Sequence, residues 1–379
     1  MRVYLNAIFL CLLCFQIKSQ NLRIDSLIYQ IKNAQITQTN NFYSAGLFAS
    51  TRNYLKSKHY ERQDDNVFFT GLVVWTLRNQ QLFLSAENTK IVDSICAKAV
   101  SNYPSYRNKY GDCTYNFWQP KPNRHFPNDH YFSSRNKYAL PDDLDDTAIL
   151  YLSGNHSDSL KNCLRTKMAK HANGNPTYIN NTFRKYKYET AYNSWFGNKI
   201  DVDFDICVQS NALRWVLDNH YILDKHDSAT IQLLKKMVLA DEHIEYAHYI
   251  SPHYQKSTIV LYHLARLIAT HPDYFVEIKQ KLINDIIQQT GIAKHPMEKL
   301  LLASSLARFS VFSEERLRLI KSDFDGFYFF VANMTSVAPN PLKRWFARCK
   351  RTNFYYESEG YYYTLLLEYE CLMLKKSKK

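Results

Sequence analysis

The sequence lacks the short motifs that most directly assign a function. Its histidines, His125 and His253 among them, have no HExxH spacing and are candidates only for pocket positions. Its cysteines form no CxxC pair and no cluster with histidine, which excludes the usual thiolate zinc site. No segment resembles a nucleic-acid-binding motif, and no fixed period marks a repeat protein. We therefore expect no nucleic-acid partner and no solenoid.

Long apolar runs are also scarce. The one clear run, residues 3–17, follows Met1 and Arg2 and precedes Lys18 and Ser19, which is the layout of a secretory signal peptide and is too short to span a bilayer. We expect residues 1–19 to be a signal peptide and the mature chain to be exported, to the periplasm or outside the cell. No linker or break in composition interrupts residues 20–379, so these are predicted to form a single domain.

Acidic residues are outnumbered by basic ones. The chain has 48 Lys and Arg against 35 Asp and Glu, a formal net charge of +13, and loss of the two positive charges of Arg2 and Lys18 leaves +11. This balance favours anionic partners and is compatible with peripheral contact with an anionic membrane surface. Diphosphate esters and acidic glycans both fit it, so a small-molecule substrate and a glycan substrate stay open.

Apolar residues follow two helical patterns that alternate along the chain. In one pattern they lie on all sides, as in a helix that is buried all round. In the other they form a single stripe, as in an outer helix that faces solvent. The first pattern covers residues 65–77, 147–152, 207–217, 257–269, 297–309 and 360–374. The stripes run through 91–103, 160–168, 231–238, 275–286 and 317–320, and residues 22–36 would supply the sixth outer helix.

The alternation predicts an all-α fold of about six helical hairpins, an α/α toroid with a ring of buried helices inside a ring of amphipathic ones. Three insertions, residues 104–141, 173–202 and 322–357, are rich in aromatic and polar residues and have little helical periodicity. We predict loops or short strands there. Because each insertion precedes a buried helix, we expect all three at one mouth of the ring, where loops commonly carry a site.

Four carboxylates crowd into five positions at Asp142, Asp143, Asp145 and Asp146, directly before the apolar run 149–152. Like charges this close raise one another's pKa, so a buried member can stay protonated near neutral pH and act as an acid. The same oxygens can gather a divalent cation such as Mg²⁺, although no cofactor is firmly implied. A helix N-cap needs only one Asp, so capping alone does not account for the cluster.

Other predicted inner helices also begin with acidic residues, namely Asp65, Asp203, Asp205 and Glu359. In a toroid the N-termini of the inner helices point into one cavity. The pair Asp203 and Asp205 is therefore expected to face the first cluster, where two sets of carboxylates can do acid and base work.

Aromatic residues precede both acidic sets. Tyr115, Phe117 and Trp118 come before the first set, and Trp195 comes before the second. An aromatic wall beside a carboxylic acid can stabilise a carbocation through the faces of its rings, and it can also stack on a sugar. We interpret these four residues as substrate-binding candidates, together with Asp65 and Glu359.

Residues 143–148, Asp-Leu-Asp-Asp-Thr-Ala, resemble the DxDD signature of class II terpenoid cyclases, which belong to a superfamily of α/α-toroid cyclases and prenyltransferases. The resemblance implies that the motif lies at the top of an inner helix and that its middle aspartate protonates an alkene or an epoxide. Carried over by position, the proton donor is Asp145, and Asp143 and Asp146 tune it. The chain would be a divergent, exported member that acts on an apolar or isoprenoid substrate in a central aromatic cavity.

Two other functions stay open on the same residues. A secreted glycan-active enzyme would take one carboxylate from each acidic set as acid and base. A toroid that had kept the scaffold and lost the chemistry would only bind. The QxxxGxW repeats of triterpene cyclases are absent, so the resemblance depends on the DxDD motif and the helix pattern.

Overall fold

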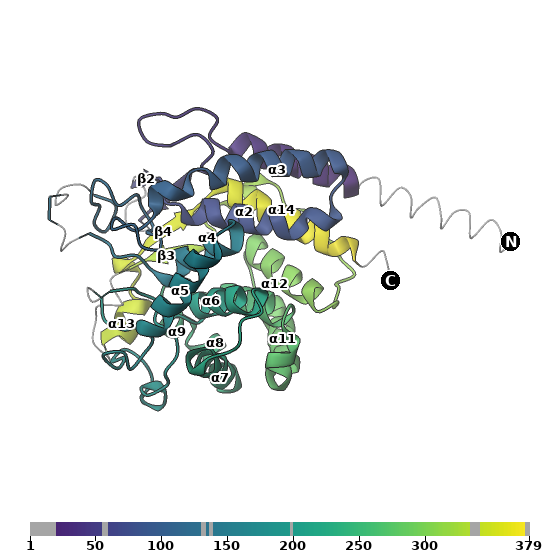
Figure 1. Cartoon of the computed structure of the whole chain (residues 1–379). Coiled ribbons are helices and arrows are strands. Elements are labelled where there is room, and N and C mark those ends of the chain that lie inside the picture. Colours follow the sequence, from purple (N-terminus) through teal and green to yellow (C-terminus); the bar gives the residue numbers. More distant parts are fainter. Residues whose placement is uncertain are drawn as a thin grey trace.

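The computed structural model describes residues 20–54, 60–129, 134–135, 139–197, 200–333 and 342–375. Over these residues the chain is mostly helical and carries one small sheet (Figure 1). The expected signal peptide, residues 1–19, lies outside the described part. None of the described helices combines the length and the apolar character that a membrane crossing requires.

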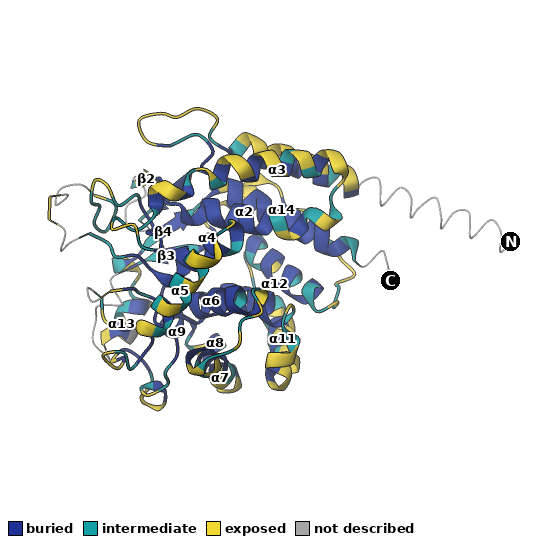
Figure 2. Ribbon diagram, viewed as in Figure 1, coloured by how far each residue is buried: buried dark blue, intermediate teal, exposed yellow. Residues whose placement is uncertain are grey.

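One set of helices is buried on most sides (Figure 2). It consists of α2 (Phe68–Gln80), α4 (Leu144–Ser153), α6 (Ile206–Asp218), α10 (Ser257–Ile268), α12 (Pro296–Arg308) and α14 (Glu359–Leu374). Each packs on two others of the set: α2 on α4 and α14, α6 on α4 and α10, and α12 on α10 and α14. The packing contacts therefore close into a circuit, and we refer to these helices as the ring helices.

A second set has one buried face and one exposed face. It consists of α3 (Ala86–Val100), α5 (Asp158–Lys170), α7 (Lys225–Leu239) and α11 (Val276–Ile292), to which the helical residues 20–34 are added. The buried side chains of α3, among them Val92, Ile95 and Ala99, recur at spacings of three and four, as the sequence predicts. Three short α-helices also lie in the described part of the chain: α8 (Glu242–Glu245), α9 (Ala247–Ile250) and α13 (Leu342–Arg348).

Polar caps explain where three of the outer helices begin. The Ser85 side chain accepts the N–H of Asn88 at the start of α3, and Ser157 caps α5 in the same way. Asp224 and Asp227 form a reciprocal capping box at the start of α7. Each cap satisfies N–H groups that have no partner inside the helix, so the helices start at these residues.

Close packing between α2 and α4 depends on Gly71. A Cβ atom at this position would lie 2.8 Å from Cγ2 of Ile149 and 3.0 Å from Cδ2 of Leu150. Any larger residue would push the two helices apart. Farther along the ring, Trp215 of α6 packs edge-on against Tyr151 of α4 with 5.4 Å between ring centroids. Aromatic rings thus fill the interfaces between ring helices.

The predicted outer helix through Leu317 and Ile320 is wrong. Residues 311–320 are not helical. The Leu317 N–H instead donates to the Tyr369 hydroxyl at 3.1 Å, and Arg23 donates to the carbonyl of Leu319 at 3.0 Å. Side chains of neighbouring helices bind this backbone, so Leu319 is buried without a helix, whereas Ile320 of the predicted stripe is exposed.

A four-stranded antiparallel sheet was not part of the all-α expectation. Its order is β2 (Glu61–Asp64), β1 (Ser50–Asn53), β4 (Phe354–Glu357) and β3 (Phe330–Ala332). Strands β3 and β4 fall in the insertion 322–357, where loops or short strands were expected, whereas β1 and β2 lie in a segment for which no strand was predicted. The sheet lies beside the start of α2, where Phe330 packs on Phe68 at 4.9 Å.

Candidate functional site

The start of α4 lies between two of the insertions. Asp143 forms isolated β-bridges with Tyr115 on one side and Trp195 on the other. The Leu144 N–H donates to the carbonyl of Ser194 at 2.9 Å. Backbone bonds therefore hold the acidic segment at the end of the ring helices where α4 and α6 begin. We call this the loop end, and the opposite end, where α10 and α12 finish, the far end.

Asp145 is a buried carboxyl group at the loop end. Its Oδ1 accepts a hydrogen bond from Nδ2 of Asn211 at 2.8 Å, and its Oδ2 accepts one from the Tyr254 hydroxyl at 2.5 Å. Burial, together with the nearby carboxylates of Asp143 and Asp205, raises the pKa of Asp145 to about 7. The two hydrogen bonds favour the ionised form and lower the pKa, but burial outweighs them. Within the described part of the chain, no cation pairs with it. Asp145 is therefore an acid that can hold its proton near neutral pH.

Asp143 and Asp146 form a second pair of buried carboxyls. Asp143 caps α4, since its Oδ1 accepts the N–H of Asp146 at 2.8 Å. Burial raises the pKa of Asp143 to about 6, and it raises the pKa of Asp146, to which the neighbouring Asp143 charge contributes further. Oδ1 of Asp146 is buried without a hydrogen-bond partner among the described residues. Asp143 is thus the one Asp of the cluster that caps the helix. Because their pKa values are raised, Asp143 and Asp146 can also exchange protons near neutral pH.

Asp205 and Asp203, the two members of the second acidic set, bind different partners. Asp205 caps α6 and accepts from the Ser251 hydroxyl at 2.6 Å and the His253 N–H at 3.2 Å. Burial raises its pKa, and its charge reaches Asp145. Asp203 is bound instead by the buried ammonium group of Lys343 on α13. Only Asp205 therefore faces the first cluster as a carboxyl group without a salt bridge.

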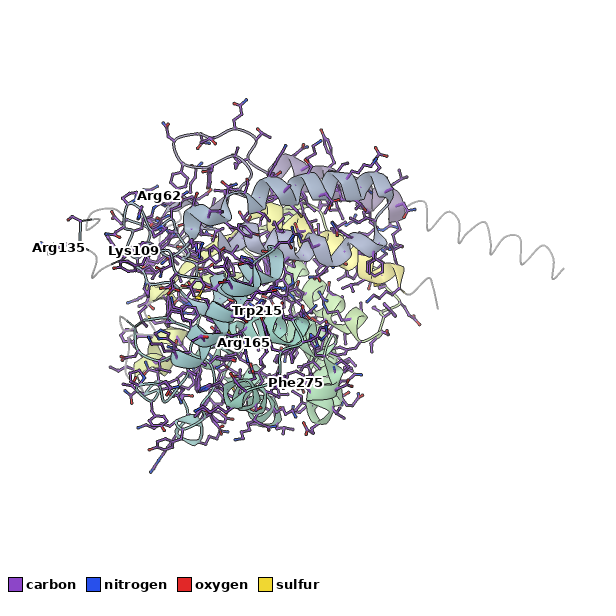
Figure 3. The ribbon with its side chains drawn as sticks, in the orientation of Figure 1. Arg62, Lys109, Arg135, Arg165, Trp215 and Phe275 are labelled. Atoms are coloured by element: carbon purple, nitrogen blue, oxygen red, sulfur yellow. A yellow bond between two sulfur atoms is a disulfide. The ribbon has the colours of Figure 1, made fainter. Side chains whose placement is uncertain are left out.

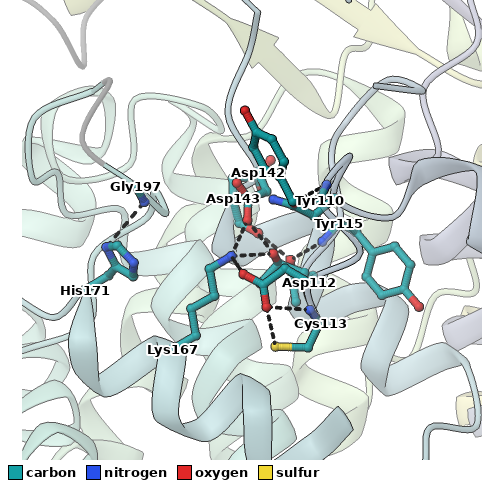
Figure 4. A network of polar contacts seen from close by, with 12 residues as sticks. Tyr110, Asp112, Cys113, Tyr115, Asp142, Asp143, Lys167, His171 and Gly197 are labelled. Carbon is teal, nitrogen blue, oxygen red and sulfur yellow. Dashed lines mark hydrogen bonds and ion pairs between the residues drawn. The ribbon is translucent and has the colours of Figure 1, made fainter. Parts of the chain in front are cut away.

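Asp142 points away from Asp145 toward α5. Nζ of Lys167 lies 2.7 Å from Oδ2 of Asp142, 2.6 Å from Oδ2 of Asp112 and 2.8 Å from Oγ1 of Thr114 (Figure 4). The ammonium group forms an ion pair with each of the two carboxylates, so this outer part of the cluster is ion-paired whereas the inner part is not. A disulfide between Cys113 and Cys163 joins the same loop to α5. The pairing of these cysteines was open in the sequence.

A cavity of about 330 Å³ adjoins the Lys167 ion pairs. Its volume is at the lower end of the range for small-molecule sites. Oδ1 of Asn116 is buried beside it and has no hydrogen-bond partner among the described residues. The walls mix amides, charged groups and rings, and they include Asn108, Asn116, Trp118, Arg124, Asp142 and Phe196.

Three of the four predicted aromatic residues belong to one network of rings, and Tyr115 lies apart. Phe117 packs edge-on against Trp118 with 5.0 Å between ring centroids, and Phe330 links Phe117 through His253 to Trp195. Phe117 stacks on Phe330 at 5.4 Å, in a cluster that also holds Tyr254. Trp118 lines the cavity and donates its Nε1–H to the buried Asp64 at 2.8 Å. Trp195 packs edge-on against His253 with 5.9 Å between ring centroids. The Tyr115 hydroxyl lies 3.1 Å from Nε2 of His156.

The remaining two candidates do not join Asp145. Asp65 is buried and paired with Arg124, on the cavity side. Glu359 lies at the start of α14, where its partly exposed carboxylate pairs with Lys321 at 2.8 Å. On the outer surface of the loop end, Arg62, Lys109 and Arg135 extend outward (Figure 3).

The sequence did not reveal Asn211 and Tyr254, the two donors to Asp145. Asn211 is a polar residue within the buried pattern of α6, and such a residue is a signal that could have marked a partner. Tyr254 lies in a short loop before α10 and carries no comparable signal.

The donor set does not fit a divalent cation. In the part of the chain that the structure describes, three metal-ligand atoms converge only at Asp112, Cys113 and Cys163, and these two cysteines are joined in the disulfide. At the acidic cluster, Asp142 is bound by Lys167 and Asp145 by Asn211 and Tyr254. We derive no step through a metal ion.

Comparisons of the chain with protein-family models, with curated proteins and with solved structures give no match.

Proposed function

We propose that the chain is an α/α-toroid enzyme similar to class II terpenoid cyclases, in which Asp145 is the general acid. The circuit of ring helices, with amphipathic helices outside it, supports the toroid. The observation that carries the chemistry is the Asp145 carboxyl group, which is buried, hydrogen-bonded to Asn211 and Tyr254, and free of an ion pair among the described residues.

In the proposed step, Asp145 transfers its proton to one carbon of an alkene. The π electron pair forms the new C–H bond and leaves a carbocation on the other carbon. The Asp145 carboxylate that forms is stabilised by the N–H of Asn211 and the O–H of Tyr254, which are already in place. Loss of a proton from the final cation to water, and uptake of one by Asp145, makes the overall reaction an isomerisation.

Aromatic rings near Tyr254 suit an apolar substrate and a cation. Phe68, Phe117 and Phe330 pack together with Tyr254 at the loop end. Their faces carry negative electrostatic potential and attract a developing positive charge. They also exclude water, which would otherwise capture the cation. An isoprenoid is the substrate class that these surroundings favour.

The test is conversion of polyprenyl diphosphates, squalene and squalene epoxide, followed by mass spectrometry. We expect the wild-type protein to give cyclised isomers and Asp145→Asn to lose at least about 100-fold in turnover. At pH 5, where the Asp145 carboxyl group is protonated and the amide resembles it, the melting temperature should stay within about 2 °C. Asp112→Asn is the matched control and should retain turnover. Conversion that survives Asp145→Asn would reject the proposal.

The cavity beside Lys167 favours a second candidate, a glycan-binding or glycan-active protein. Its amides, charged groups and the ring of Trp118 are the kinds of group that hydrogen-bond and stack on sugars. The two carboxylates, Asp112 and Asp142, are both bound to Lys167, which favours binding over acid and base catalysis. Titration with neutral and acidic oligosaccharides tests this candidate. Asn116→Ala should abolish saturable binding if the sugar occupies this cavity.

A further inference from the structure

The far end of the ring helices buries an arginine without a carboxylate partner. Arg266, in the last turn of α10, is 4% exposed, and no described carboxylate forms an ion pair with it. Its Nη1 has no hydrogen-bond partner among the described residues. The guanidinium carbon lies 3.4 Å from the ring centroid of Trp75, so a cation–π contact covers one face of the group.

A second guanidinium group lies close by. Arg308, in the last turn of α12, pairs with Glu368 of α14, and the Tyr262 hydroxyl donates to the other oxygen of that carboxylate at 2.7 Å. The guanidinium carbons of Arg266 and Arg308 lie 5.2 Å and 5.9 Å from the ring centroid of Tyr262. Nε of Arg308 is also buried without a hydrogen-bond partner in the described part.

These groups leave one positive charge uncompensated. Two guanidinium groups face one carboxylate, since Arg214, the other arginine near them, is already paired with Asp218. An arginine cannot lose its proton in a protein, and an unpaired buried charge is costly. The ammonium group of Lys375 lies within reach of the Arg308 charge: burial, and then that charge, lower its pKa.

We propose that a small monovalent inorganic anion, of which chloride is the type, binds at the far end between Arg266 and Arg308. One such ion balances the local charge, whereas a phosphate dianion would exceed it. The ion accepts from Nη1 of Arg266 and Nε of Arg308, two buried donors that have no partner among the described residues. Side chains of α10 and α12 then share one bound ion, which joins these two ring helices. The proposal does not depend on the function of Asp145.

The direct test is crystallography of the full chain grown in bromide, with anomalous diffraction at the bromine absorption edge. We expect one anomalous peak in contact with the guanidinium groups of Arg266 and Arg308. Ordered water only at this position, with no anomalous peak, would overturn the proposal.

A solution test uses the melting temperature in chloride and in gluconate at equal ionic strength. Chloride should raise the melting temperature saturably, by about 1–3 °C, because an ion that binds only the folded state stabilises it. Arg266→Gln should remove the difference between the two salts, and Arg214→Gln, at the same end but paired with Asp218, should keep it. An equal melting temperature of the wild-type protein in both salts would contradict the proposal. The same holds for a difference that persists in Arg266→Gln.

Discussion

The loop end and the far end of the ring helices bury opposite charges and handle them differently. At the loop end Asp143, Asp145 and Asp205 are buried, and no described cation forms a salt bridge with them. At the far end Arg308 pairs with Glu368, while Arg266 lies on Trp75. Helix dipoles favour both arrangements, because carboxylates suit helix N-termini and guanidinium groups suit C-termini.

The difference lies in what each group can do when it is buried without a partner. A carboxylate can take up a proton and become neutral, so burial turns it into an acid near neutral pH. A guanidinium group cannot lose its proton, so it needs an anion or a ring face. The loop end is consequently suited to proton transfer, and the far end is suited to holding charge in place.

The largest expected effect comes from breaking the ion pair at the far end. Arg308→Met leaves the buried Glu368 carboxylate with only the Tyr262 hydroxyl, and we expect a loss of about 3–5 kcal/mol in the free energy of unfolding. Urea denaturation at pH 7 measures it. Lys321→Met breaks the exposed pair with Glu359 and should cost less than about 1 kcal/mol. Similar losses in the two variants would show that burial does not set the value of these pairs.

The pH dependence of stability should identify Asp145 at the loop end. Its pKa is about 7 in the folded protein and near 3.8 when unfolded, so the folded state binds more protons between these values. The contribution of Asp145 to stability is therefore full below about pH 4 and is lost as the pH rises through 7, by on the order of 4 kcal/mol.

The measurement is the difference in the free energy of unfolding between the wild-type protein and Asp145→Asn from pH 5 to 8. Taking the difference removes the opposite contribution of buried histidines such as His263, whose pKa burial lowers to about 3. We expect the variant to gain stability relative to the wild type as the pH rises. A difference that does not change with pH would mean that the carboxyl group is ionised throughout.

Removing one hydrogen-bond donor to Asp145 should change the pKa of its carboxyl group. Tyr254→Phe deletes a hydrogen bond that favours the ionised carboxylate, so the pKa of Asp145 should rise by about one unit. The alkaline limb of the pH–rate profile, where activity falls as the general acid loses its proton, would move upward by the same amount. Tyr262→Phe is the matched control, since its hydroxyl binds Glu368 at the far end and should leave the profile in place. An unchanged profile in Tyr254→Phe would separate Asp145 from the titrating group.

The smallest effect is expected at the ion-paired outer side of the cluster. Asp112→Asn removes one of the two carboxylates bound to Lys167, and Asp112 is partly exposed. We expect a loss of less than about 1 kcal/mol by urea denaturation. A loss of several kcal/mol would assign Asp112 a structural role comparable with that of the buried groups.

Much of the helical framework could be predicted from the sequence. Buried and striped patterns marked the positions of the ring helices and of α3, α5, α7 and α11, because burial on all sides and burial on one face leave different periodicities. The helix predicted through residues 317–320 was wrong, because Tyr369 and Arg23 supply hydrogen bonds to this segment from elsewhere in the fold. Strands β1 and β2 were not predicted either, because each is only four residues long, whereas β3 and β4 lie in the insertion 322–357, for which loops or short strands were expected.

The site could be predicted only in outline. The crowding of Asp142, Asp143, Asp145 and Asp146 marked the right segment, but only tertiary contacts decide which carboxylate is ion-paired and which is not. Lys167 pairs with Asp142, whereas Asn211 and Tyr254 bind Asp145 from 66 and 109 residues away. No local pattern encodes contacts at that separation.

We propose that Asp145 is a buried acid which keeps its proton near neutral pH. Titration of its carboxyl ¹³C resonance by NMR tests this directly, with Asp145→Asn identifying the signal. A midpoint about pH 7 is the predicted result. A midpoint about pH 4, the ordinary value of an aspartate in water, would contradict the account.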